Sequence, residues 1–314
     1  MAESENRPGL SPLQGRLLVI CAGVLWSLNG VFNTMLRQDT TFGLNVPEVL
    51  PIHIAFFRAM FAGLAFLPTL RRGDISWKPM MLFMAIAFAV MNITFVTAMA
   101  IDNVAKALAL QYVAPMWTYI AGLIWLGESP NRRSLFSVML AVLGVAVIVW
   151  GGWRHGQLPV VALGVVSGLM YSAVLIFLRK LKSESSRWLT ALNFLVSAIV
   201  LVPFVIAVPV PTWPQMICLL IFGTIQLALP YWLIAKGLQS VSPQEVACLT
   251  LIEVPLSPMW AWLVASNPKP PLLTDLIGAA VILAALLLRY VPIRRTPAPP
   301  AVSGNCQGGD SALR

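Results

Sequence analysis

The sequence predicts an all-α integral membrane protein of ten transmembrane helices, arranged as two inverted repeats of five helices. The first reason is composition, since 58% of the 314 residues are hydrophobic and 11% are charged, whereas soluble proteins carry about 25% charged residues. The second reason is a series of apolar runs of membrane-spanning length. The third is an echo of the first half of the chain in the second half. Lipid is therefore the expected solvent for most of the chain.

A helix needs about 20 apolar residues to cross a hydrocarbon core of about 30 Å. Ten runs of suitable length lie near 16-36, 52-70, 80-100, 104-126, 134-151, 159-178, 188-208, 214-236, 245-265 and 273-291. Compact polar breaks separate them, and the longest connection covers residues 37-51. We expect a cytoplasmic segment at 1-15, a first repeat at 16-151, a second repeat at 152-291 and a disordered cytoplasmic tail at 292-314.

The distribution of Lys and Arg predicts the orientation, because cytoplasmic loops retain positive charge during insertion. With the N-terminus in the cytoplasm, sixteen of the 21 basic residues lie on that side, four lie on the other side and Arg58 lies within the second span. The expected protein is a multi-pass protein of the cell (inner) membrane with both termini in the cytoplasm. The net charge of +9 does not indicate nucleic acid, because the charges fall in short loops rather than on one polar face.

Two short motifs recur at nearly the same spacing. Residues 23-27 (GVLWS) are echoed at 168-172 (GLMYS), 145 residues later, and residues 115-117 (PMW) recur at 258-260, 143 residues later. Because five spans separate the copies, the second copy enters the membrane with opposite polarity. Inverted repeats of this kind enclose a cavity at mid-depth and favour alternating access, while chance similarity between apolar helices is the alternative interpretation.

Several motifs in these spans are similar to those of one known family. They are Phe57-Arg58-Ala59 running into Ala62-Gly63-Leu64, Pro115 followed by Leu126-Gly127-Glu128, and Leu251-Ile252-Glu253 leading to Pro258-Met259-Trp260 and to Gly278 through Leu283. Over about residues 15 to 290 the chain resembles the EamA-type family of the drug/metabolite transporter superfamily. It departs at Ser266-Asn267-Pro268, where a second Gly-Glu is expected. The resemblance implies a ten-helix exporter or exchanger of small metabolites, often amino acids or related compounds.

Two charged residues within spans are the leading site candidates, because a charge at mid-bilayer costs about 2.5 to 3.5 kcal/mol on insertion scales. Arg58 could bind a substrate carboxylate, or it could form a structural ion pair with an acid such as Glu253. Glu253 lies beside Pro255 in the ninth span and could exchange a proton with the substrate, or it could be a carboxylate that only packs between helices. Lys106, near the turn between the third and fourth spans, is interpreted as a snorkelling or loop charge.

Polar and aromatic residues within the spans could line a cavity that binds an amphipathic solute. These candidate substrate-binding residues are Trp26, Asn29, Asn92, Gln111, Tyr112, Trp117, Tyr171, Gln226, Tyr231 and Trp260. Prolines that interrupt matching spans of the two halves point to a transport site or simply kink the helices. They are Pro115, Pro230, Pro255 and Pro258.

The leading hypothesis for function is a secondary transporter that exports or exchanges a small metabolite, an amino acid or a related compound, by alternating access. The sequence contains no phosphate loop, no zinc-binding helix motif and no nucleophile elbow, so no enzyme activity, metal or cofactor is predicted. An integral-membrane enzyme and a non-transporting membrane scaffold are the alternatives. The expected partners are a small-molecule substrate and the lipid bilayer, with a coupling proton and a second copy of the chain as further candidates, and no nucleic acid.

Overall fold

The computed structural model describes residues 11–101, 104–125, 132–181, 183–237, 240–241, 246, 249–266 and 272–290. Over these residues the regular structure is helical, apart from an isolated bridge between Thr40 and Ala265. Eight helical segments are long and apolar enough to cross a membrane. Two shorter apolar helices, Thr250–Val264 and Leu273–Leu288, lie where the ninth and tenth spans are predicted. The all-helical membrane fold is thus confirmed, with eight helices of membrane-spanning length and two shorter apolar helices among the described residues.

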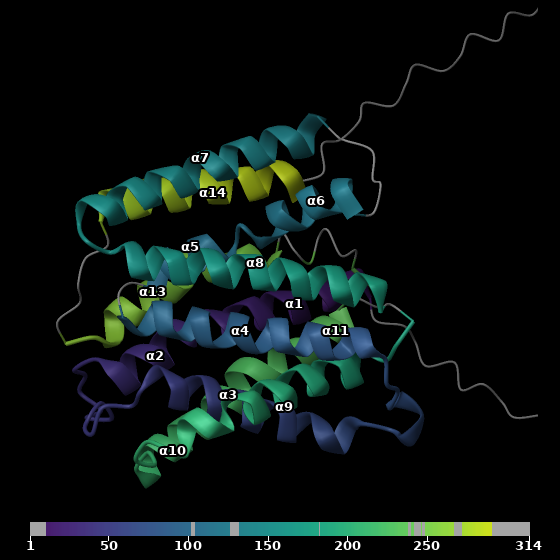
Figure 1. Cartoon of the computed structure of the whole chain (residues 1–314), viewed down its shortest axis with the longest axis vertical. Coiled ribbons are helices and arrows are strands. Elements are labelled where there is room, and N and C mark those ends of the chain that lie inside the picture. Colours follow the sequence, from purple (N-terminus) through teal and green to yellow (C-terminus); the bar gives the residue numbers. More distant parts are fainter. Residues whose placement is uncertain are drawn as a thin grey trace, which may run out of the picture.

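The helices run side by side along one direction (Figure 1). They are α1 (Pro12–Ser27), α2 (Asn29–Arg37), α3 (Pro51–Phe66), α4 (Pro79–Ile101), α5 (Val104–Gln111), α6 (Ala114–Trp125), α7 (Arg132–Arg154), α8 (Leu158–Lys180), α9 (Ser186–Val205), α10 (Trp213–Ile221), α11 (Leu229–Gly237), α13 (Glu253–Val264) and α14 (Leu273–Tyr290). Short 3-10 turns cover Leu67–Thr69, Arg72–Asp74 and Thr250–Ile252. The pair α7 and α14 forms one flank, α4, α8, α1 and α11 lie in the middle, and α3 packs on α9 at the other flank.

Four spans depart from a continuous α-helix, and residues at or beside each of these departures line one central cavity. The first span breaks at Leu28, between α1 and α2, and the fourth breaks at residues 112–113, between α5 and α6. The eighth span contains a π-helix, Phe222–Ala228 (η3), between α10 and α11. The ninth changes from a 3-10 turn to α-helix at Glu253. Interruptions of this kind expose backbone groups that side chains or ligands must satisfy.

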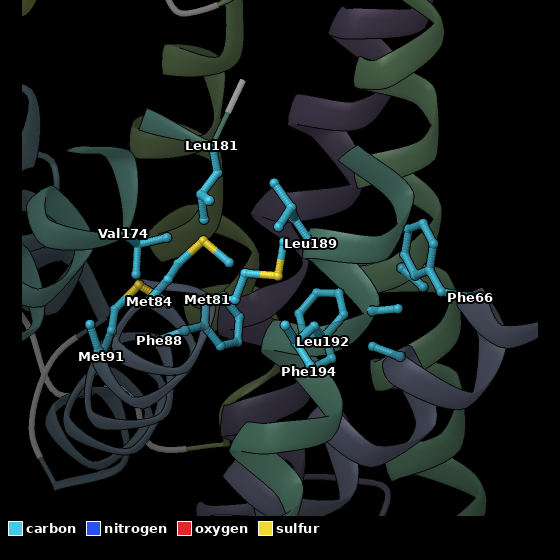
Figure 2. Close-up of a cluster of buried hydrophobic side chains, with 14 residues drawn as sticks. Phe66, Met81, Met84, Phe88, Met91, Val174, Leu181, Leu189, Leu192 and Phe194 are labelled. Carbon is cyan, nitrogen blue, oxygen red and sulfur yellow. The ribbon is translucent and has the colours of Figure 1, made fainter. Parts of the chain in front are cut away.

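A buried cluster of Met and Phe side chains holds α4 against α8 and α9 (Figure 2). The ring of Phe194 lies edge-on to both Phe88 and Tyr231, with centroids 5.3 and 5.4 Å apart. Edge-to-face pairs of this geometry add to the stabilisation from buried apolar area. The cluster thereby fixes Tyr231 at the edge of the central cavity.

The two ends of the bundle carry different loops. We call the end with loop residues 70–78 and 181–185 the basic end; there Lys78 pairs with Glu184 at 2.6 Å, and Trp188 Nε1 donates to the Ser76 carbonyl at 2.7 Å. The Lys78 and Ser76 hydrogen bonds hold the pKa of Glu184 below its usual value of 4.5. At the other end, which we call the opposite end, loop residues 38–50 lie against α10, because Gln215 Nε2 donates to two of their carbonyls at 2.8 and 2.7 Å.

Candidate functional site

A cavity of about 120 Å³ lies in the middle of the bundle, at the level where the broken spans face one another. Its lining residues are Trp26, Asn29, Arg58, Phe88, Met91, Phe95, Gln111, Tyr112, Tyr171, Gln226, Leu227, Tyr231, Thr250 and Glu253. Nine of these were predicted from the sequence. The sequence analysis missed the other five, Phe88, Met91, Phe95, Leu227 and Thr250. Apolar and hydroxyl side chains are common throughout an apolar span, so the sequence does not indicate which of them face a cavity.

The guanidinium of Arg58 is the fixed positive charge of the cavity. Arg58 is 4% exposed, its Nη1 donates to Asn29 Oδ1 at 3.2 Å, and its Nη2 donates to Asn92 Oδ1 at 2.6 Å. The ring of Phe222 lies 5.2 Å from its central carbon, a separation at which a cation is attracted to an aromatic face. Among the described residues no ion pair joins Arg58 to Glu253, so its charge is held by neutral groups.

Asn92 contributes to the site by orienting Arg58. Its amide nitrogen donates to the Ala55 carbonyl at 2.9 Å and contacts Ser197 Oγ at 3.2 Å. Those bonds leave the amide oxygen directed at the guanidinium. Asn92 is 2% exposed and is not among the residues that line the cavity, so it supports the site from behind.

Glu253 is the acidic group of the cavity and is the first residue of α13. Tyr112, at the break of the fourth span, donates its hydroxyl to the Glu253 carboxylate at 2.6 Å. The breaks of the fourth and ninth spans, predicted to be equivalent, therefore meet through this hydrogen bond.

At the break in the first span, side chains from the second half of the chain form hydrogen bonds with the unpaired backbone groups. In a regular helix the Gly30 N–H would donate to the Trp26 carbonyl. Instead the Gly30 N–H donates to Ser257 Oγ at 3.2 Å, and the Trp26 carbonyl accepts from Gln226 Nε2 at 2.9 Å. Both opened backbone groups are thereby satisfied, and the site is built jointly by α1, α2, η3 and α13.

An apolar chamber of about 420 Å³ adjoins the central cavity on the side of the basic end. Six residues line both the central cavity and the apolar chamber: Trp26, Phe88, Tyr112, Tyr171, Tyr231 and Thr250. The remaining walls are Val174, Leu175, Leu178, Thr190, Asn193, Phe194, Ile234, Val246, Leu251 and Leu286. Most of these positions lie near the ends of α8, α11 and α14 and the start of α9, so a solute in the chamber would meet aromatic rings before it reached the charges.

The structure places the other predicted residues away from the cavity. Trp117 lies in a separate groove between α6 and α8, and Trp260 is not among the residues that line the central cavity. Pro115 is the second residue of α6, just after the break, and Pro230 is the second residue of α11, just after the π-helix. Pro255 and Pro258 lie in α13, beyond Glu253.

The interpretation of Lys106 as a snorkelling or loop charge was wrong. Its side chain is fully buried, its ammonium lies 3.2 Å from Asp275 Oδ2, and it donates to Gln157 Oε1. Asp275, at the start of α14, is equally buried. Opposite charges on the fourth and tenth spans were the available signal for this pair, since each alone would be expensive in an apolar span.

A bundle of apolar helices around a polar, charged cavity defines a membrane transport protein of the multi-pass class. The comparison with protein families makes this definite. The model of the EamA-like transporter family matches the chain twice, over residues 13–150 and 158–291. The chain therefore belongs to the EamA-like transporter family, as the resemblance of its motifs predicted.

Relatives that align over nearly the whole chain are transporters by name. An uncharacterized transporter of Archaeoglobus fulgidus is 27% identical over 282 residues, which cover 88% of this chain and 96% of the relative. The pseudopaline exporter CntI of Pseudomonas aeruginosa is 23% identical, with 87% and 95% covered. A protein of known crystal structure, 13% identical, aligns with 91% of this chain and all of its own with a TM-score of 0.60, which shows a shared fold. The family and these names indicate transporters rather than enzymes.

Proposed function

We propose that the protein is a secondary transporter that exports or exchanges an amino acid or a related small metabolite by alternating access. The observation that carries the proposal is that Arg58 and Glu253 line the same cavity but form no ion pair with each other in the described part of the chain. Each is hydrogen-bonded to a neutral side chain instead. A solute with a carboxylate and an amine can satisfy both charges at once. Tyr and Trp side chains around them supply apolar surface for the rest of the solute.

The helix contacts support two inverted repeats of five spans. If the two halves are equivalent, the first span corresponds to the sixth, the second to the seventh, and so on. Each helix contact between the halves should then have an equivalent contact in which both spans are replaced by their counterparts. The packing of α1 on α11 corresponds to that of α4 on α8, and α3 on η3 corresponds to α4 on α9. The contacts of α5 and α6 with α8 correspond to those of α13 with α1 and α2. Inverted repeats of this kind allow the two bundles to rock about a central site.

The basic end is the cytoplasmic end in this proposal, because cytoplasmic loops retain Lys and Arg. The apolar chamber then leads from the cytoplasm to the charged cavity, which is the state expected of an exporter before it loads its substrate. In this proposal both termini are cytoplasmic, because α1 begins and α14 ends toward the basic end, and the membrane is the cell (inner) membrane.

Glu253 is the residue that would couple transport to a proton. It is a carboxylate within the cavity with one neutral partner, Tyr112, so protonation would change the charge that a substrate amine meets. Glu253→Gln should therefore abolish the dependence of flux on a pH gradient, and the exchange of substrate for substrate that remains should show a weaker apparent affinity, because the charge that meets the amine is lost.

The direct test is flux in liposomes that contain the purified full-length protein. Radiolabelled amino acids, amines and carboxylates would be offered as a panel on either side of the membrane. Wild type should move at least one compound that carries both charges, and Arg58→Ala should lower its flux at least tenfold, as expected when a charged hydrogen bond is lost. Arg187→Ala is the matched control, because Arg187 lies in the basic end and donates to the Thr69 carbonyl at 3.2 Å, away from the cavity. Absence of flux for the whole panel would contradict the proposal.

A further inference from the structure

The π-helix Phe222–Ala228 brings the eighth span unusually close to Arg58. A Cβ added at Gly223 would lie 2.7 Å from the Arg58 carbonyl oxygen, so only glycine permits this approach. Phe222 stacks on Phe32 at 4.8 Å and lies beside the guanidinium. Short π-helical segments inside α-helices occur frequently at functional sites. The sequence did not predict this π-helix, and the π-helix contains neither Arg58 nor Glu253, the two charged residues proposed to bind the substrate.

Proline gives a physical reason for the π-helix at this place. In a regular α-helix the carbonyl of Gln226 would accept from the N–H of residue 230, but Pro230 has no N–H. In the π-helix the Leu229 N–H donates to the Thr224 carbonyl five residues earlier, and the wider turn relieves the clash of the proline ring with the Gln226 carbonyl. The widened turn also sets the direction of Gln226, which lines the central cavity and is 2% exposed.

The side-chain amide of Gln226 is oriented without ambiguity. One end contacts the Trp26 carbonyl at 2.9 Å, and because a carbonyl oxygen only accepts, that end must be the NH₂ group. The amide oxygen at the other end is buried and has no hydrogen-bond partner among the residues that the structure describes. Buried side-chain acceptors are nearly always satisfied in proteins, so an orphaned one within a binding cavity points to a missing donor.

We infer that Gln226 is a specificity-determining residue whose amide oxygen accepts a hydrogen bond from an N–H of the substrate. The inference rests on the proposed function and deepens it, because it requires a substrate nitrogen that carries hydrogen rather than a positive charge alone. Arg58 is held by α3 and stacked on Phe222 of the π-helix. The π-helix therefore provides Gln226 and also contacts Arg58. One small zwitterion could bind Gln226 through its N–H group and Arg58 through its carboxylate.

The test compares a substrate with its N-trimethyl derivative, which keeps the positive charge but has no N–H. The parent compound is the amino acid of the liposome panel that wild type transports best. Each derivative is measured as an inhibitor of parent flux with full-length protein, in wild type, Gln226→Met, Gln226→Glu and Thr224→Val. Met removes the acceptor at similar length, whereas protonated Glu retains an oxygen at the same position and an O–H that can donate to the Trp26 carbonyl. Thr224 belongs to the same π-helix, is not among the cavity residues and donates to the Leu220 carbonyl at 2.7 Å.

Wild type and Thr224→Val should prefer the parent over the trimethyl derivative at least tenfold, the loss expected for one hydrogen bond to a charged group. Gln226→Met should reduce that preference to less than about threefold and Gln226→Glu should restore it, whereas a purely structural role would lower flux of both compounds equally. Equal preference in wild type and Gln226→Met, or no preference in wild type, overturns the inference and leaves the transporter proposal standing. If Gln226→Met does not fold, Gln226→Asn, which withdraws the oxygen by one methylene, decides in the same way. If wild type moves no panel compound, both proposals fall.

Discussion

The regions on either side of the central cavity differ in the side chains that fill them. Between the central cavity and the basic end lies an apolar chamber, walled largely by aliphatic and aromatic side chains. Toward the opposite end, the halves are tied by the buried pair of Lys106 and Asp275, and by Gly30, whose N–H donates to Ser257. The ties of the opposite end are buried between helices, whereas those of the basic end, Lys78 with Glu184 and Trp188 with the Ser76 carbonyl, involve its loops. In the proposed transport cycle, this difference corresponds to a state in which the charged cavity is reached from the basic end.

The largest effect should come from breaking the buried ion pair. Asp275→Ala removes the carboxylate that lies 3.2 Å from the buried Lys106 ammonium, and removal of one partner of a buried pair costs about 3 to 5 kcal/mol. Thermal unfolding in detergent would measure this as a large loss of stability. The double variant Lys106→Met with Asp275→Leu should recover most of it, because the ammonium and the carboxylate are then removed together. Single and double variants of equal stability would show that the pair does not hold the opposite end.

A smaller effect is expected from a wedge at the same end. A Cβ at Gly30 would lie 2.6 Å from the Ser257 carbonyl oxygen, which is backbone and cannot rotate away. Gly30→Ala should therefore force α2 from α13 at a cost of about 1 to 3 kcal/mol. It should also increase labelling of Ala261→Cys by an impermeant maleimide added at the opposite end.

Gly73→Ala is the control for the wedge, since nothing lies within 4 Å of a Cβ there. It should change neither stability nor labelling. If Gly30→Ala behaves in the same way as this control, the close packing of α2 on α13 is not what closes the opposite end.

The smallest effect concerns the loops of the basic end. The pKa of Glu184 is lowered by hydrogen bonds from Lys78 and Ser76, so its contribution to stability is present above the usual value of 4.5 and is lost as the pH falls through the lower value of the folded protein. At neutral pH Glu184→Gln should melt slightly below wild type, and the difference in melting temperature should vanish once the pH falls below the lowered pKa of Glu184. A difference that persists unchanged in acid would show that the carboxylate does not tie these loops.

The sequence predicted the membrane fold because length and hydrophobicity of a span are local properties. It also predicted that Arg58 and Glu253 line the cavity, because a charge within an apolar span is costly unless it faces a polar interior. The break at Leu28 and the π-helix at Phe222 could not be predicted, because both depend on groups far along the chain. The Trp26 carbonyl is free for Gln226 only when the eighth span lies beside the first.

The central claim, that the charged cavity communicates with the basic end and is closed toward the opposite end, is tested most directly by labelling Thr190→Cys, a chamber residue, in a variant without other reactive cysteines. Sealed vesicles of each orientation would be treated with an impermeant maleimide. The account predicts rapid labelling when the basic end faces the reagent, slower labelling when the opposite end does, and protection by transported substrate. Faster labelling from the opposite end would contradict it.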